Sequence, residues 1–292
     1  MTALLEVDDL VVEYPVHHGV FRAVDKVSFS VDAGRTLAIV GESGCGKSTI
    51  ARSIVRLLTP TSGRILLDGE DIARMPERQF RPIRSRVQMV FQDPYGSLDP
   101  HLTAEQIVAE AVTLRGGAMS KAERSTQAAQ FLDQVGLGEN SLHRKPNEFS
   151  GGQRQRIGIA RALASKPELI VLDEATSALD VSVQAEILKL LGFLQSNTGV
   201  TFIVISHNLG VVREISDTVV VMSKGEILER GDTKTVLASP KHPYTRALRA
   251  AALDPTTMRG VKPREALAAV RVAKALDPSH AAIVTPAVLG AH

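Results

Sequence analysis

The sequence predicts an α/β fold with a mainly parallel core sheet. Runs of consecutive apolar residues, typical of strands covered by helices on both faces, occur at Leu37–Val40, Leu169–Leu172, Val200–Ile205 and Val219–Met222. Segments with helical periodicity separate these runs, and such alternation favours parallel strands. A glycine-rich loop joins the first run to a helix, at the strand end where parallel sheets place ligands.

The N-terminal and middle parts of the chain carry different patterns. Leu4–Tyr14 and Ala23–Val31 alternate apolar and polar residues, which predicts antiparallel strands joined by a loop that contains His17 and His18. The two histidines have no other metal ligand nearby in sequence, so a metal role is disfavoured. From Leu102 to Phe149 apolar residues recur at helical spacing without strand signals, so we expect a helical insertion.

Helical periodicity also predicts helices at about Gly152–Ser165, Val183–Leu194 and Tyr244–Ala252. We expect a domain at residues 1–252, with a helical subdomain at about 95–165. A C-terminal extension is expected at 253–292, partly mobile and with one short helix at Pro263–Leu276. No internal repeat is found, so we expect one functional unit.

Composition and charge exclude several classes of protein. The 292-residue chain has a formal net charge of +2, whereas nucleic-acid-binding domains usually carry a strong basic excess, so no nucleic-acid partner is expected. No apolar run approaches the ~18 residues of a membrane span. Residues 1–10 hold three acids and no basic region, so no signal peptide is expected. The single cysteine, Cys45, excludes an internal disulfide and indicates a reducing compartment.

The loop after the first apolar run reads GESGCGKST and matches the pattern G-x-x-x-x-G-K-[ST], in the context of strand, loop and helix that this pattern requires. Its glycines let the backbone curl and point N–H groups at an anion, and the helix adds its positive dipole end. Lys47 is predicted to reach the β- and γ-phosphates, and the Ser48 hydroxyl to bind Mg²⁺. An ordinary glycine-rich turn and a redox role of Cys45 are the disfavoured alternatives. The predicted nucleotide contacts are Gly41, Glu42, Ser43, Gly44, Cys45, Gly46, Lys47, Ser48 and Thr49.

Two acidic residues follow the apolar strand Leu169–Leu172. Asp173 ends this strand, where α/β sheets place ligand sites, so it is predicted to hold Mg²⁺ directly or through water. Glu174 comes next and points elsewhere, so it is predicted to act as general base or to orient the attacking water. The alternative is that both acids cap the next helix. Together with the phosphate loop, the pair predicts nucleotide hydrolysis.

Further motifs follow in a recognisable order. Leu169–Glu174 reads LIVLDE, and Phe149–Gln153 reads FSGGQ. With the phosphate loop, these segments resemble the Walker B, signature and Walker A motifs of the ATPase subunit of an ABC transporter. The resemblance covers about Leu4–Ala252 and implies the P-loop ABC ATPase fold, with an N-terminal antiparallel β subdomain, a helical subdomain and ATP and Mg²⁺ as cofactors. Phe149 replaces the commoner leucine of the signature and remains apolar.

The resemblance also implies roles for single residues. Gln92 matches the Q-loop glutamine, and His207 matches the switch histidine, which is able to donate to the γ-phosphate. Tyr14 falls where the family stacks an aromatic ring on adenine, although aromatic residues in strands are most often core. The predicted catalytic residues are Lys47, Gln92, Glu174 and His207. The predicted metal ligands are Ser48, Gln92 and Asp173.

The signature segment forms a second predicted anion site. Ser150, Gly151, Gly152 and Gln153 precede or begin a helix and offer a hydroxyl, N–H groups and a dipole. The resemblance implies that this site serves the ATP of a second ATPase subunit, packed head to tail. A heterodimer is expected, with a homodimer left open. Asp180, in the D-loop sequence SALD, is also predicted to lie at the nucleotide.

Two stretches narrow the branch of the family. Val90–Pro100 (VFQDPYGSLDP) and His242–Leu248 (HPYTRAL) resemble the ATPases of oligopeptide, dipeptide and nickel importers, in particular the second of two such subunits. This resemblance implies two transmembrane permease subunits, an extracytoplasmic substrate-binding protein and a peripheral position at the cytoplasmic face of the membrane. Peptide is favoured over nickel or another small solute. The tail lacks the cysteines of an iron–sulfur cluster, so none is predicted.

Two other functions are weighed. A soluble ABC ATPase of translation or DNA repair usually has two cassettes or a long coiled-coil insertion, and this chain has neither. A regulatory module without turnover is disfavoured by Glu174 and His207. Between Asp71 and Arg86 lie five arginines, which form either a solvated face or a contact with an acidic partner such as the permeases.

Overall fold

The structure is a computed structural model, and it describes residues 3–17, 19–115, 118–177 and 179–253. The described residues fall into two units, which divide between Pro240 and Lys241. The helix α10 (Pro243–Leu253) belongs to the second unit. Its bounds differ by one residue at each end from the predicted Tyr244–Ala252. The predicted domain 1–252 extends past this division. The helix predicted at Pro263–Leu276 lies outside the described residues.

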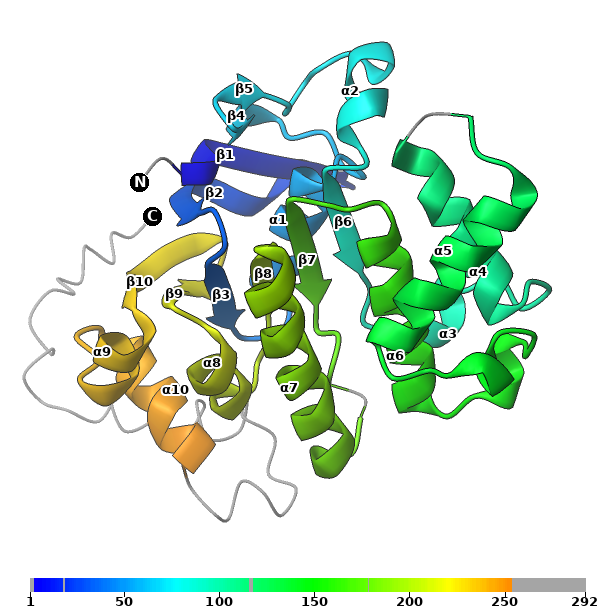
Figure 1. Ribbon diagram of the computed structural model, residues 1–292. Helices are drawn as coiled ribbons and strands as arrows, with labels where there is room; N and C mark the ends of the chain where they lie inside the picture. Colours follow the sequence, from blue (N-terminus) through cyan, green and yellow to red (C-terminus); the bar gives the residue numbers. More distant parts are fainter. Residues whose placement is uncertain (1–2, 18, 116–117, 178, 254–292) are drawn as a thin grey trace, which may run out of the picture. The chain divides into compact units, whose positions relative to one another are not determined.

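The larger unit contains a six-stranded sheet in which β3 occupies a central place (Figure 1). β3 pairs in parallel with two strands that come much later in the chain, and only the edge strand β10 runs antiparallel to its neighbour. The mainly parallel sheet predicted from the apolar runs is thereby confirmed. The order is β10 (Glu226–Asp232), β9 (Thr218–Ser223), β3 (Thr36–Gly41), β8 (Thr201–Ile205), β7 (Leu169–Asp173) and β6 (Val87–Val90).

A second, antiparallel sheet is built on an N-terminal hairpin. Its order is β2 (Gly19–Asp32), β1 (Ala3–Val16), β4 (Ser62–Leu67) and β5 (Glu70–Asp71). The antiparallel N-terminal sheet is confirmed, but both strands run further than predicted, so the connection between Tyr14 and Ala23 is much shorter than expected. Pairing continues to Val16 and Gly19, because apolar and β-branched residues persist on both strands.

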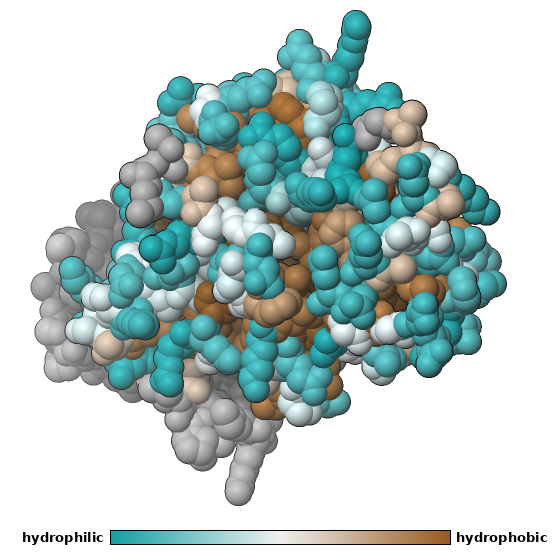
Figure 2. All heavy atoms as spheres, in the orientation of Figure 1, coloured by the Kyte–Doolittle hydropathy of each residue, from teal (hydrophilic) through white to brown (hydrophobic). Residues whose placement is uncertain are grey.

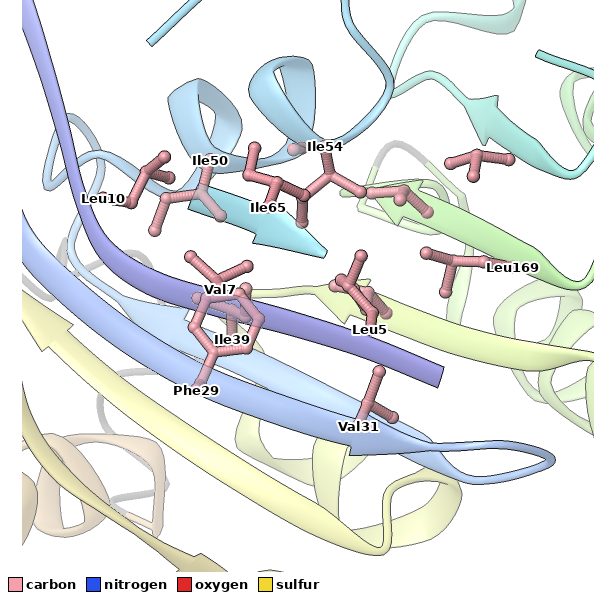
Figure 3. Close-up of a cluster of buried hydrophobic side chains, with 14 of the residues drawn as sticks. Leu5, Val7, Leu10, Phe29, Val31, Ile39, Ile50, Ile54, Ile65 and Leu169 are labelled. Carbon is pink, nitrogen blue, oxygen red and sulfur yellow. The ribbon is translucent and has the colours of Figure 1, made fainter. Parts of the chain in front are cut away.

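The main hydrophobic core lies between these two sheets, around the helix α1 (Lys47–Ile54). Figure 3 shows side chains of β1, β2 and β4 meeting those of β3 and β7 around Ile50 and Ile54. Both isoleucines are completely buried, and burying one such side chain contributes about 1.5–3 kcal/mol. This packing anchors the helix that follows the phosphate loop.

Helices dominate between β6 and β7, as the spacing from Leu102 to Phe149 predicts. Three of them begin with a capping box. In each, the side chain of the first residue accepts a hydrogen bond from the backbone N–H three residues later, and the side chain of that later residue accepts one from the backbone N–H of the first. The first residues are Thr103, Ser120 and Ser150. Their apolar faces form a second core against β7 and β8. The helices are α3 (Pro94–Ser97), α4 (Ala104–Val112), η1 (Thr113–Arg115), α5 (Lys121–Gln134), η2 (Glu139–Ser141), η3 (Pro146–Glu148) and α6 (Gly151–Ala164).

Four further helices complete the larger unit: α2 (Glu77–Ile83), α7 (Val181–Thr198), α8 (Leu209–Ile215) and α9 (Thr233–Ala238). α7 is longer at both ends than the predicted Val183–Leu194, and it ends at Gly199 in a left-handed conformation. α8 and α9 are too short to show a periodic signal in the sequence. None of the helices among the described residues is long and apolar enough to span a bilayer.

Candidate functional site

The phosphate loop lies between β3 and α1, and its glycines are required by close backbone contacts. A Cβ atom at Gly41 would lie 2.2 Å from the Met222 carbonyl oxygen, and one at Gly46 would lie 2.4 Å from the Ala23 carbonyl oxygen. Gly46 also has φ +105°, in the left-handed region, immediately before the first residue of α1. The loop is therefore held between β9 and the N-terminal hairpin, with the start of α1 directed at it.

Lys47 is buried inside this loop. Its side chain donates to the carbonyl oxygens of Gly41 (2.8 Å) and Glu42 (2.7 Å), and Lys47 is only 4% exposed. A buried ammonium group is costly unless it is paired, and the two carbonyl oxygens and the weak acceptor Cys45 Sγ at 3.8 Å satisfy it only partly. An anion at the loop would complete its coordination. Ser43 and Gly44 are exposed at the loop's tip, while Ser48 and Thr49 are half-buried in the first helical turn.

The side chains of Ser48 and Asp173 meet at the carboxyl edge of the parallel sheet. The Ser48 hydroxyl donates to Asp173 Oδ1 at 2.9 Å, although the residues are 125 positions apart. Burial raises the pKa of the Asp173 carboxyl, and the hydrogen bond from Ser48 opposes that effect. Two neighbouring ligands of an octahedral Mg²⁺ at about 2.1 Å lie about 3.0 Å apart. The spacing of Ser48 Oγ and Asp173 Oδ1 therefore fits a magnesium ion bound by both oxygens, or by one of them directly and the other through a water molecule.

Glu174, Gln92 and His207 converge beside this pair. Gln92 Nε2 donates to Glu174 Oε2 at 3.1 Å, and His207 Nδ1 lies 3.5 Å from Glu174 Oε1. Glu174 has φ +47°, a left-handed conformation that costs about 1–3 kcal/mol in a residue with a side chain. Because the chain turns at this point, Asp173 faces Ser48 while Glu174 faces Gln92 and His207. Three of the four predicted catalytic residues, Gln92, Glu174 and His207, are thus brought together.

The position of His207 depends on Asn208, which the sequence analysis did not single out. Asn208 caps α8: its Oδ1 accepts from the N–H groups of Gly210 (2.9 Å) and Val211 (3.4 Å). Ser206 Oγ accepts from the Asn208 N–H at 3.0 Å. A cap residue directly before an apolar stretch was the available signal. These bonds fix the turn that carries His207 beyond the end of β8.

The signature residues begin α6 and form a closed capping box. Ser150 Oγ accepts from the Gln153 N–H (3.3 Å), and Gln153 Oε1 accepts from the Ser150 N–H (3.0 Å). A Cβ at Gly152 would lie 2.4 Å from Val183 Cγ1, so the glycine allows α6 to pack closely on α7. Among the described residues, no hydrogen bond or ion pair joins this segment to the phosphate loop.

Three further residues predicted to contact the nucleotide, Tyr14, Cys45 and Asp180, differ in their burial. Tyr14 is half-buried against the main core and pairs across the hairpin with Phe21, which is 53% exposed. Cys45 is buried, and its burial raises the pKa of the thiol, so a reactive thiolate is disfavoured. Asp180 is exposed at the start of α7, and its side chain makes no capping hydrogen bond.

Comparison with known proteins shows the family of the chain. The sequence profile of the ABC transporter family matches residues 24–177. The chain belongs to the ABC transporter family. As an ABC ATPase it binds and hydrolyses ATP, and the predicted fold and enzyme class are confirmed.

Relatives of this ABC ATPase match most of its length. It is 53% identical over 264 residues to the probable peptide ABC transporter ATP-binding protein y4tS of Sinorhizobium fredii, covering 88% of this chain and 74% of that protein. It is 45% identical over 246 residues to the oligopeptide transport ATP-binding protein OppF of Bacillus subtilis, covering 84% and 81%. The dimeric structure of the ATP-binding cassette MJ0796 bound to ADP and Pi matches with a TM-score of 0.73 at 32% identity, covering 78% and 98%.

Proposed function

We propose that this ABC ATPase supplies the energy for peptide import. Its relatives named for peptide and oligopeptide transport are 45–53% identical over most of the chain. The segment HPYTRAL, which we linked to such importers, begins α10. His242 Nδ1 accepts from the Tyr244 N–H at 3.1 Å, so this segment carries its own helix cap. The names of the relatives favour peptide over nickel as the transported solute, whereas HPYTRAL fits both.

The observation that carries the catalytic part is the convergence of four strand ends. Lys47 follows β3, Gln92 follows β6, Asp173 ends β7 with Glu174 behind it, and His207 follows β8. Carboxyl ends of parallel strands meet at one sheet edge, so these side chains surround one ligand position.

Each side chain has a role that its environment supports. Ser48 and Asp173 would hold Mg²⁺, with the amide oxygen of Gln92 as a further ligand, since that oxygen is not used in the bond to Glu174. Glu174 would orient or deprotonate the attacking water, and His207 would donate to the γ-phosphate. Bound Mg²⁺ neutralises charge on the phosphates during transfer. Tyr14 would stack on adenine from the hairpin.

The second half of each site would come from another ATPase subunit. Ser150 and Gln153 satisfy each other at the start of α6, so the helix end offers its remaining N–H groups to an anion from outside the chain. The exposed Asp180 at α7 would approach the same nucleotide. Val181, beside Asp180 at the start of α7, is 83% exposed. Figure 2 shows further apolar residues at the surface in the middle of the view. Apolar surface of this kind favours a protein partner.

The complete importer would contain two permeases, an extracytoplasmic binding protein and a pair of ATPases, with a heterodimer expected. This chain would lie at the cytoplasmic face of the membrane, attached through the permeases. The arginines of α2 offer a contact: Arg78 and Arg81 are exposed and make no hydrogen bond or ion pair with another described residue. Arg84 is less available, because it pairs with Glu77 at 2.7 Å and stacks on Phe80.

The test is reconstitution of the chain with its membrane subunits in lipid vesicles. ATP hydrolysis should rise when binding protein loaded with a peptide mixture is added, and Glu174→Gln should abolish the rise. Stimulation by nickel-loaded binding protein instead of peptide would contradict the substrate class. Absence of hydrolysis by the assembled complex would contradict the importer assignment.

A further inference from the structure

Gln155 lies in α6, and the nitrogen of its side-chain amide is buried without a partner. The residue is 1% exposed, and its Nε2 atom makes no hydrogen bond to any residue in the described part of the chain. A buried amide donor that remains unpaired lowers stability. Methionine or leucine would fill a similar volume without that cost. An unsatisfied buried group in a folded protein therefore calls for a functional explanation.

The position of Gln155 follows from the register between α6 and β6. Ser165, just after the helix, donates to the carbonyl oxygen of Ser85 at 3.0 Å, and a Cβ at Gly158 would lie 3.8 Å from Val90 Cγ1. The helix thus runs antiparallel to the strand. Gln155 is three residues closer to the helix N-terminus than Gly158, or about 4.5 Å along the axis. At about 3.3 Å per strand residue, this places it beside the segment that follows Val90.

The neighbouring helix closes the other side of Gln155. A Cβ at Gly152, three residues earlier, would lie 2.4 Å from Val183 Cγ1 of α7. Residues three apart lie on the same side of a helix, so Gln155 is enclosed between the end of β6 and the start of α7. Its amide has little freedom to reach solvent. The register places the segment 91–93 beside it, and this segment carries Gln92, which contacts Glu174.

We propose that Gln155 is a positioning residue for ATP hydrolysis: when the segment 91–93 shifts during the catalytic cycle, the buried amide nitrogen donates a hydrogen bond to its backbone and so fixes the new position of Gln92. This inference rests on the roles proposed above for Gln92 and Glu174. It links the signature helix of a chain to the catalytic group of the same chain. In the arrangement described, the unpaired amide lowers the stability of the fold. When the segment 91–93 moves, the amide gains a hydrogen bond and stabilises the shifted arrangement.

Gln155→Met tests this inference in the full-length chain, because methionine keeps the length and removes the amide. We expect an unchanged or higher Tm, an ATP affinity within about twofold of the unsubstituted chain, and a kcat about tenfold lower, which corresponds to about 1.4 kcal/mol of activation free energy. Ile157→Met is the control, since Ile157 is fully buried on the same helix and has no polar group. Its kcat should stay unchanged.

A double-mutant cycle separates positioning from packing. In a Gln92→Ala background, Gln155→Met should lower kcat by less than twofold, because the residue it positions is gone. A full tenfold loss in that background would overturn the proposal. So would an unchanged kcat in the single variant, or a lowered Tm, which would make the amide a structural group. Failure of the proposed function would show separately, as absent hydrolysis by the unsubstituted chain.

Discussion

Substitution of Gly46 by alanine tests the tightest contact of the phosphate loop. A Cβ would lie 2.4 Å from the Ala23 carbonyl oxygen, about 1 Å inside the ordinary contact distance of 3.4 Å. Overpacking of this kind costs about 1–3 kcal/mol. The backbone at φ +105° adds about 1–2 kcal/mol for a residue with a side chain. The expected loss for Gly46→Ala is therefore about 2–5 kcal/mol, a large part of the stability of a typical domain.

Gly44→Ala is the matched control in the same loop. Gly44 has φ +81°, but a Cβ there would meet no heavy atom within 4 Å, so only the backbone cost of about 1–2 kcal/mol applies. The chain has no tryptophan, so thermal unfolding is best followed by far-UV circular dichroism without nucleotide. At about 2–4 °C per kcal/mol, Gly46→Ala should melt several degrees below Gly44→Ala. Equal Tm values for the two variants would refute the steric argument.

The remaining predictions concern charge and catalysis. Glu174→Gln should retain ATP and reduce phosphate release at least about 100-fold, and retained hydrolysis would exclude Glu174 as the base or water-orienting group. Asp173→Asn should melt above the unsubstituted chain at pH 8 without nucleotide, since burial raises the pKa of this carboxyl and the folded state then binds its proton more tightly than the unfolded state. The contribution of this carboxyl to the stability of the unsubstituted chain therefore falls as pH rises through the range above the usual aspartate pKa. The gain from asparagine should shrink towards acid pH in calorimetry, and a gain independent of pH would contradict this cause. Arg81→Glu should leave ATP binding intact and weaken co-purification with the permeases, whereas unchanged co-purification would count against a contact through α2. Arg84→Glu is a poor test of that contact, because it also breaks the pair with Glu77.

Local patterns made the phosphate loop and the position of Asp173 predictable. A glycine-rich loop between an apolar strand and a helix has few alternative conformations, and Asp173 follows an apolar run whose parallel pairing is readable from sequence. The carboxyl edge of a parallel sheet is where ligands bind, so Asp173 was expected at the ligand site, and Ser48 lies at the same edge. Pattern and topology agreed at this site, which explains why the predicted residues meet.

Features that depend on tertiary contacts escaped prediction. Arg86 is one of five arginines between Asp71 and Arg86, and the sequence does not distinguish it from the others. Only the fold shows that Arg86 Nε donates to Oε1 of Glu168, 82 positions away, at 2.6 Å. α8 has seven residues, too few for periodicity to show, although its Asn208 cap was visible. Gln155 was overlooked because a glutamine in a helix is ordinarily assigned to the surface, and its burial follows from the packing of α6 between two neighbours.

The central place of β3 has a consequence for synthesis of the protein. Both of its sheet neighbours, β8 and β9, lie beyond residue 200, so a growing chain holds the phosphate-loop strand without lateral partners until most of the polypeptide has left the ribosome. A nascent fragment that ends before residue 201 lacks both strands and His207. We therefore expect such ribosome-bound fragments to be unable to bind ATP, even though they already contain the complete loop sequence.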